Sequence, residues 1–133
     1  MKIKYDRIMN PSDLSKTKRN LIIFDDCVTE LNQDVMSAYF TRGKHNNCNS
    51  IYLSQSWFDL PKKALRNNSN FIILFRLNKR DKDLIYSDLF SNTLEKGDFN
   101  FTVNNQWQEK YKYIVFDKDK DIILADIFQN YIQ

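Results

Sequence analysis

Three short strand-like runs, each separated from the next by a longer stretch of mixed polarity, limit the folds open to this chain. They are residues 21–24 ("LIIF"), 50–56 ("SIYLSQS") and 71–77 ("FIILFRL"). Apolar runs of this length are typical of strands buried on both faces, as in parallel sheets. None approaches the roughly 20 apolar residues that cross a membrane, so we expect no membrane partner.

The segments between these runs predict helices, turns and a hairpin. Residues 30–41 are expected to form a helix with one apolar face, made of Leu31, Val35, Met36, Tyr39 and Phe40. The remaining expectations are a short helix or turn around Pro61 (57–70), an amphipathic helix (78–94), a connector (95–108) and a β-hairpin (112–128, turn at 117–121). This order of elements indicates a layered α/β fold, and 133 residues suffice for a single domain, 1–133.

The glycine and cysteine content excludes several kinds of site. The two glycines, Gly43 and Gly97, leave no room for a phosphate-binding loop of the form GxxxxGK[ST]. The two cysteines, Cys27 and Cys48, lack zinc-site spacing and accompany no secretory signal, so they predict small buried residues in an intracellular, reducing setting. A net charge of +3 is weak support for a nucleic-acid partner.

Two adjacent carboxylates, Asp25 and Asp26, directly follow the run 21–24, and Gln55 follows the run that begins at residue 50. Ligands of parallel sheets bind beyond the carboxyl ends of the strands, so we expect these acidic and amide groups to converge at one edge. A divalent cation between the carboxylates and a phosphate would offset their repulsion. Alternatively, the acids simply cap the following helix. A two-metal nuclease is less favoured, because adjacent strand residues point to opposite faces.

Residues 20–76 resemble the central part of the viral genome-packaging ATPases. These belong to the poxvirus-type branch of the FtsK–HerA group of P-loop ATPases, shared by large DNA viruses, virophages and Polinton-like elements. The resemblance is carried by three motifs in order: "LIIFDD" (21–26), "YFTRGKHNN" (39–47) and "IYLSQSWFDLPKKALRNNSNFIILF" (51–75). It covers about half of the chain, and the C-terminal hairpin is compatible with it.

The resemblance implies roles for individual residues. Residues 21–26 look like a Walker B strand, in which Asp25 would serve Mg²⁺ and Asp26 would stand where the family has its catalytic acid. Gln55 matches the polar residue that ends the next core strand and senses the terminal phosphate of ATP. Arg42 and Arg66 match characteristic arginines, either of which would be the finger that reaches a neighbouring subunit's nucleotide. The implied cofactors are therefore Mg²⁺ and ATP.

Each of these residues also has a simpler interpretation. Arg42 and Lys44 would then lie in a solvated loop, with Lys44 departing from the family's usual arginine. Arg66 would only cap a short helix. His45 is expected to be structural, and the aromatic pair 57–58 is expected to pack in the core or at an interface.

The resemblance also implies a fold: a partial P-loop NTPase of the RecA/FtsK type. That fold is a three-layer sandwich with a mostly parallel sheet, here ending in a C-terminal hairpin. The phosphate-binding loop is missing, so the chain looks like the C-terminal part of the core, from the Walker B strand onward. The family's first strand would lie between 50–54 and 71–75. We expect that gap to be closed by direct pairing of those strands, by another segment such as "KIKYDRIM" (2–9), or by a second chain.

Two functions follow from this resemblance. The first is a fragment or split subunit of an ATPase that drives double-stranded DNA into a capsid. It would act in a homo-oligomeric ring or with a partner chain that supplies the P-loop, together with capsid or portal components, in the virion or the infected cell. The second is an inactive module that docks to DNA or partner subunits. Its basic segments 16–19, 61–66 and 77–80 either contact phosphates or form solvated surface. Independent ATPase activity of this chain is not expected.

Overall fold

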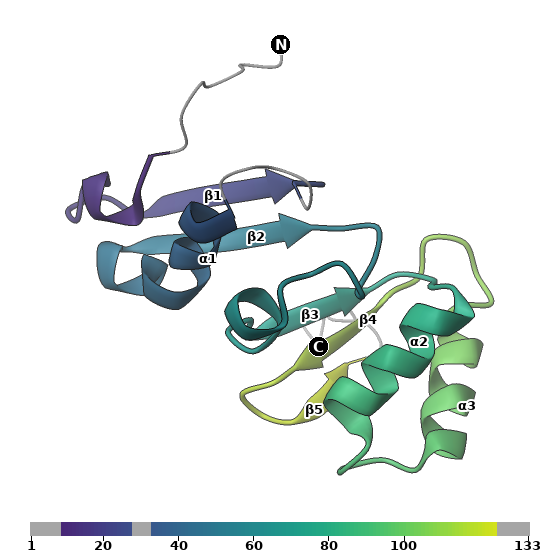
Figure 1. Ribbon diagram of the computed structural model, residues 1–133. Coiled ribbons are helices and arrows are strands. Elements are labelled where there is room, and N and C mark those ends of the chain that lie inside the picture. Colours follow the sequence, from purple (N-terminus) through teal and green to yellow (C-terminus); the bar gives the residue numbers. More distant parts are fainter. Residues whose placement is uncertain (1–8, 28–32, 125–133) are drawn as a thin grey trace. The chain divides into compact units, whose positions relative to one another are not determined.

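A computed structural model of the chain describes residues 9–27 and 33–124 and divides it into two compact units, the first ending at Asn68 and the second beginning at Ser69 (Figure 1). The first unit contains η1 (Pro11–Asp13), β1 (Asn20–Asp25), α1 (Gln33–Arg42), η2 (Gly43–Asn46), β2 (Cys48–Leu53) and the π-helical turn η3 (Lys62–Arg66). The second contains β3 (Phe71–Leu74), α2 (Lys79–Ile85), the π-helical segment η4 (Tyr86–Phe90), α3 (Lys96–Gln106), β4 (Ile114–Asp117) and β5 (Ile122–Leu124).

The first unit is a β–α–β arrangement in which β1 and β2 pair in parallel, from Asn20 opposite Cys48 to Asp25 opposite Leu53. Its buried core consists of Phe24, Met36, Tyr39 and Cys48. The predicted strands and the intervening helix are confirmed, with the described part of the helix beginning at Gln33. The prediction of buried cysteines is confirmed for Cys48, whereas Cys27 is half-buried; both are free thiols.

A close backbone approach joins η2 to β2. A Cβ atom on Gly43 would lie only 3.1 Å from the carbonyl oxygen of Cys48, so a side chain there would force the backbone to shift. Asn47, in the left-handed conformation (φ 50°), then turns the chain into β2, and its carbonyl accepts a hydrogen bond from the backbone N–H of Asn20 at 2.8 Å. These contacts fix the amino ends of both strands.

One face of the parallel pair is exposed, contrary to the expectation of strands buried on both faces. The apolar side chains on it retain 43–61% of their accessible surface: Leu21 61%, Ile23 55%, Ile51 43% and Leu53 48%. Successive strand residues alternate between faces, and α1 packs on the face that carries Phe24. The continuous apolar sequence therefore predicted the strands correctly but not what covers their second face.

The second unit is built on an antiparallel sheet of order β3–β4–β5. The predicted C-terminal hairpin is confirmed as β4 and β5. The expectation of a mostly parallel sheet is wrong for the described strands, because β1–β2 is the one parallel pairing among them. The reason is that β4 returns beside β3 in the opposite direction after α2 and α3, and all four of its residues are buried. Among the described strand pairs, β2 pairs with β1 and β3 pairs with β4, so the expected pairing of β2 with β3 is not one of them.

The expectation of a connector at 95–108 is wrong, because residues Lys96–Gln106 form helix α3. Phe99, Val103 and Trp107 recur at intervals of four and are all buried. The ring centroid of Phe99 lies 5.1 Å from that of Phe90, which in turn lies 4.6 Å from that of Phe116 on β4. The helical period was masked by surrounding Asn, Gly and Thr residues of low helix propensity, and burial of this face outweighs that preference.

Helix α2 begins with a reciprocal cap. The side-chain oxygen of Asn78 accepts a hydrogen bond from the backbone N–H of Asp81 at 2.9 Å, while its Nδ2 donates to Oδ2 of the buried Asp81, also at 2.9 Å. Together, α2 and η4 extend over residues 79–90. The predicted helix at 78–94 is therefore confirmed, but it ends at Phe90. In the described residues, no helix has the length and apolar character needed to cross a membrane.

We expect Asn78→Ala to lower the free energy of unfolding by about 1 kcal/mol, because it removes this cap from the first turn of α2. Urea denaturation followed by circular dichroism measures the change. Asn92→Ala, at an exposed position in the turn after η4, is the matched control and should change stability by less than about 0.5 kcal/mol. Equal losses in the two variants would contradict the capping role.

Candidate functional site

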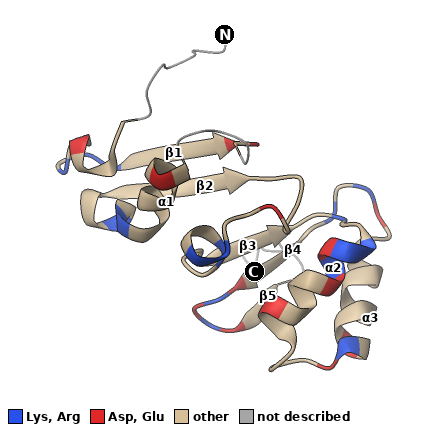
Figure 2. Cartoon of the chain, in the orientation of Figure 1, with Lys and Arg blue, Asp and Glu red and all other residues tan. Residues whose placement is uncertain are grey.

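The candidate site lies where β1 and β2 end. Figure 2 shows acidic residues at the carboxyl end of β1, and these are Asp25 and Asp26, both exposed. The backbone N–H of Asp26 donates to the carbonyl of Leu53 at 3.0 Å, which extends the parallel ladder by one residue. Asp26 then adopts the left-handed conformation (φ 50°), which Asp tolerates better than most residues. The chain therefore turns sharply at the second carboxylate.

Gln55 meets Asp26 at this edge. Its Nε2 donates a hydrogen bond to Oδ2 of Asp26 at 3.0 Å, although the two residues are 29 positions apart in the chain. The parallel register brings them together, because Asp25 lies opposite Leu53 and the next residues of both strands continue to the same side. The predicted convergence of acidic and amide groups is thus present in the structure, and Asp25 is adjacent to it along β1.

Several polar contacts that sequence reasoning missed organise the loops around this pair. The hydroxyl of Ser54 accepts a hydrogen bond from the backbone N–H of Ser56 at 3.3 Å and donates one to the carbonyl of Ser56 at 2.9 Å. These two bonds close a tight turn with Gln55 at its centre. The thiol of Cys27 donates to the carbonyl of Asp25 at 3.3 Å. Nε2 of Gln33, at the start of α1, donates to the carbonyl of Cys27 at 2.9 Å. The run Ser-Gln-Ser was the available signal for the first of these contacts.

Tyr52 lies close to this edge on the face of the sheet that α1 covers. Its ring packs 6.0 Å from that of Phe24 and 6.3 Å from that of Phe40. Its hydroxyl oxygen is buried and has no hydrogen-bond partner among the described residues. Burial raises the pKa of this hydroxyl, and the nearby thiol of Cys27 and carboxylate of Asp26 raise it further. The phenol therefore stays neutral at physiological pH.

The donor set at the edge suits a hard cation that keeps part of its water shell. Asp25 and Asp26 supply carboxylate oxygens, and neither forms a salt bridge with a described residue. Within the described ranges, no three His, Cys, Asp or Glu side chains are close enough to form a complete metal cage. Mg²⁺ is typically bound by one or two carboxylates together with waters and substrate phosphates, so these residues fit such an ion.

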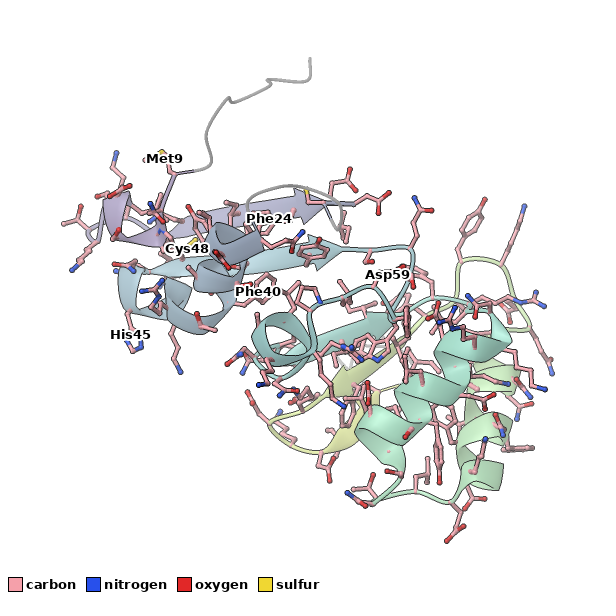
Figure 3. All side chains as sticks on the ribbon, viewed as in Figure 1. Met9, Phe24, Phe40, His45, Cys48 and Asp59 are labelled. Carbon is pink, nitrogen blue, oxygen red and sulfur yellow. The ribbon has the colours of Figure 1, made fainter. Side chains whose placement is uncertain are left out.

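Arg42 lies away from this edge within its own unit. Helix α1 runs from the carboxyl end of β1 back to the amino end of β2, and Arg42 is its last residue. Figure 3 shows His45, three residues further on in η2, at that same far end. Arg42, Lys44 and His45 are all exposed. Arg42 therefore does not join Asp26 and Gln55 in the same chain.

Arg66, the last residue of η3, is held by its surroundings. Its Nε donates to the carbonyl of Leu60 at 3.1 Å, and its guanidinium carbon lies 5.4 Å from the centroid of the Trp57 ring. Trp57 is buried, as predicted for a core aromatic, whereas Phe58 is exposed. The half-buried Arg66 is thus packed against the segment after β2.

Comparison with known proteins adds no further information about this site. No protein-family model matches the chain, and neither a curated protein nor a solved structure is significantly similar to it.

Proposed function

We propose that this chain is part of a viral DNA-packaging ATPase, a fragment or split subunit that couples ATP hydrolysis to translocation of double-stranded DNA into a capsid. The observation that carries the proposal is the hydrogen bond from Gln55 to Asp26 at the carboxyl edge of a parallel β–α–β unit. In this proposal β1 is the Walker B strand of a partial P-loop NTPase with a three-layer arrangement.

This proposal assigns a role to each polar residue at the carboxyl ends of β1 and β2. Asp25 would hold Mg²⁺, which would neutralise charge on the phosphates of ATP. Asp26 would orient the attacking water, and its carboxylate accepts a hydrogen bond from the amide of Gln55 at 3.0 Å. The exposure of these side chains leaves room for a nucleotide to approach them.

Residues 1–133 contain no phosphate-binding loop, so in this proposal the loop comes from another polypeptide or from sequence outside these residues. Only Gly43 and Gly97 are present, and Gly43 serves the close contact between η2 and β2. Among the described strands, β2 pairs only with β1, and in this proposal the strand that carries the loop pairs with the other edge of β2. Arg42, at the far end of its own unit, would act on the nucleotide of a neighbouring subunit, which favours a homo-oligomeric ring.

We expect ATP hydrolysis to appear only when this chain is mixed with a packaging-ATPase polypeptide from the same genome that contains GxxxxGK[ST]. Asp26→Asn should lower the rate of the mixture by about a hundredfold or more, because it removes the group that orients water. Asp13→Ala, at an exposed acid in η1, is the control and should leave the rate unchanged. A steady-state phosphate-release assay measures all three mixtures.

Calorimetric titration of the chain alone with Mg²⁺ and ATP shows whether the chain binds nucleotide without the usual loop. Binding that Asp25→Ala abolishes would mean that phosphate is held without the usual loop. No binding, together with no activity in the mixture and a normal circular dichroism spectrum, would overturn the ATPase proposal.

The alternative function is a catalytically inactive module that docks to DNA or to packaging subunits. The lack of a phosphate-binding loop in the chain favours it, as does the half-exposed apolar face of β1 and β2. Exposed apolar patches on small proteins commonly mark interaction sites. This module would bind a partner subunit equally well with Asp26→Asn, whereas the ATPase would lose activity.

A further inference from the structure

The loop between α3 and β4, residues 107–113, is fixed at one end of the second unit. At its start, the indole Nε1 of buried Trp107 donates to the carbonyl of Leu74, the last residue of β3, at 3.3 Å. At its other end, the ring of Tyr113 packs 5.9 Å from that of Phe75. Both ends of this segment, the Tyr111 loop, therefore lie beside the residues that follow β3.

This arrangement gathers positive charge from two parts of the sequence. Leu74 pairs with Ile114, so the residues after β3 lie beside those before β4. The cations on these two segments are Arg76, Lys79 and Arg80 between β3 and the start of α2, and Lys110 and Lys112 in the loop. Figure 2 shows basic residues on the start of α2 and on this loop.

The acidic groups nearby leave this end of the unit positive. Glu109 lies 3.8 Å from Lys112 across an exposed ion pair, and Asp81 is buried in the cap of α2. Exposed pairs of this kind are weak in water. Asp83 of α2 is also partly exposed, but it pairs with Lys96 at 3.0 Å and lies near Lys79. Cations still outnumber the acids on these two segments, which makes this end of the unit suited to an anionic ligand.

Tyr111 projects from the centre of this positive end. Its side chain is 81% exposed, the highest value among the large apolar and aromatic side chains described. Its backbone is left-handed (φ 65°), a conformation that bulky residues rarely adopt and that glycine adopts freely. The ammonium of Lys110 lies 5.6 Å from the ring centroid. Neither packing nor backbone preference accounts for an aromatic residue at this position.

We propose that the Tyr111 loop and the start of α2 bind single-stranded nucleic acid. The five cations would hold successive backbone phosphates, and the ring of Tyr111 would stack on an unpaired base. Flanking lysines and an exposed aromatic are the combination that binds single strands with little sequence preference. A duplex keeps its bases stacked inside the helix and offers this ring no partner. The site is separate from the Asp25–Asp26 edge and does not depend on the proposed ATPase function.

Fluorescence anisotropy with a labelled oligothymidylate of about twelve nucleotides, within the usual range of site sizes, tests the proposal at low salt. Tyr111→Gly should weaken binding roughly five- to a hundredfold, as expected for loss of one stacked base. Glycine suits the positive φ, so this variant should melt at or above the wild-type temperature. Tyr111→Phe should keep the affinity. Phe101→Ala, at a residue of α3 that is 70% exposed, is the control and should bind as wild type.

The phosphate contacts are tested by salt dependence. Replacing both Lys110 and Lys112 by glutamine should reduce the slope of log affinity against log salt by about 1.4, since each neutralised phosphate of a single strand contributes about 0.7. The same replacement at Lys16 and Lys18, which have the same spacing and are both exposed, should leave the slope unchanged.

Three results would overturn the proposal: no binding at low salt, wild-type affinity in Tyr111→Gly, or a duplex of equal length bound as tightly as the single strand. The assay contains neither nucleotide triphosphate nor Mg²⁺, so its failure is distinguishable from failure of the ATPase proposal.

Discussion

Replacing Phe24 with alanine is expected to lower the free energy of unfolding of the first unit by about 3–5 kcal/mol. The side chain is only 4% exposed, and its ring lies 5.6 Å from that of Tyr39 on α1 and 6.0 Å from that of Tyr52 on β2. Truncation leaves a cavity between a helix and a two-stranded sheet whose other face is already open. Few neighbouring side chains can move in to fill it.

The two tryptophans of the chain allow this loss to be assigned to one unit. Trp57 lies in the first unit and Trp107 in the second, and both are buried. In a Trp107→Phe background, urea denaturation followed by fluorescence reports on Trp57 alone. Ile23→Thr is the control, because Ile23 precedes Phe24 on the exposed face, and it should cost less than about 1 kcal/mol. Similar losses for Phe24→Ala and Ile23→Thr would mean that α1 does not pack on this strand.

The stability of this small core bears directly on the candidate site. Phe24 precedes Asp25, so the ring that anchors β1 to α1 also holds the strand end from which both carboxylates project. Two-stranded sheets without further support are marginally stable in water. The position of Asp26 relative to Gln55 therefore depends on helix packing more than on the two strands themselves.

The sequence allowed the juxtaposition of Asp26 and Gln55 to be predicted from the connection between the strands. Two apolar runs joined by a single helix are expected to be parallel neighbours, because parallel strands need a crossover connection of a dozen or more residues, usually a helix. Parallel strands end at the same edge, and so the polar residues that follow them meet. The hairpin was equally predictable, since the charged residues 117–121 separate two short apolar runs.

Features that depend on tertiary contacts could not be predicted. The left-handed backbone of Asp26, which turns the carboxylate toward Gln55, is not encoded by residue type alone. The distance of Arg42 from Asp26 depends on the direction in which α1 runs along the sheet, because Arg42 is the last residue of that helix. The exposed face of β1 was missed for a similar reason. An apolar run predicts that its side chains are buried, but it does not identify the element that covers them.

Helix α3 shows how a weak local pattern can still specify structure. Its sequence, "KGDFNFTVNNQ", contains glycine and three asparagines, and its two phenylalanines are two residues apart, which is strand-like spacing. Only Phe99 and Val103 are buried within the helix, with Trp107 following as its cap residue. Three side chains on one face were sufficient, because η4 offers the rings of Tyr86 and Phe90 for Phe99 to pack against.

Replacing Phe99 with alanine is therefore expected to lower the free energy of unfolding of the second unit by about 3–5 kcal/mol. The side chain is 1% exposed, and its ring centroid lies 5.1 Å from that of Phe90 and 5.3 Å from that of Tyr86. Trp107 fluorescence in a Trp57→Phe background measures the loss during urea denaturation.

Phe101→Ala is a closely matched control, because it makes the same substitution two residues along the same helix at a side chain that is 70% exposed. It should change stability by less than about 0.5 kcal/mol. A strand at these positions would place both phenylalanines on the same face, so both variants would then lose stability together. A helix places them about 200° apart, so only Phe99 should matter. The ratio of the two losses thus measures, in solution, which of the two periodicities this segment adopts.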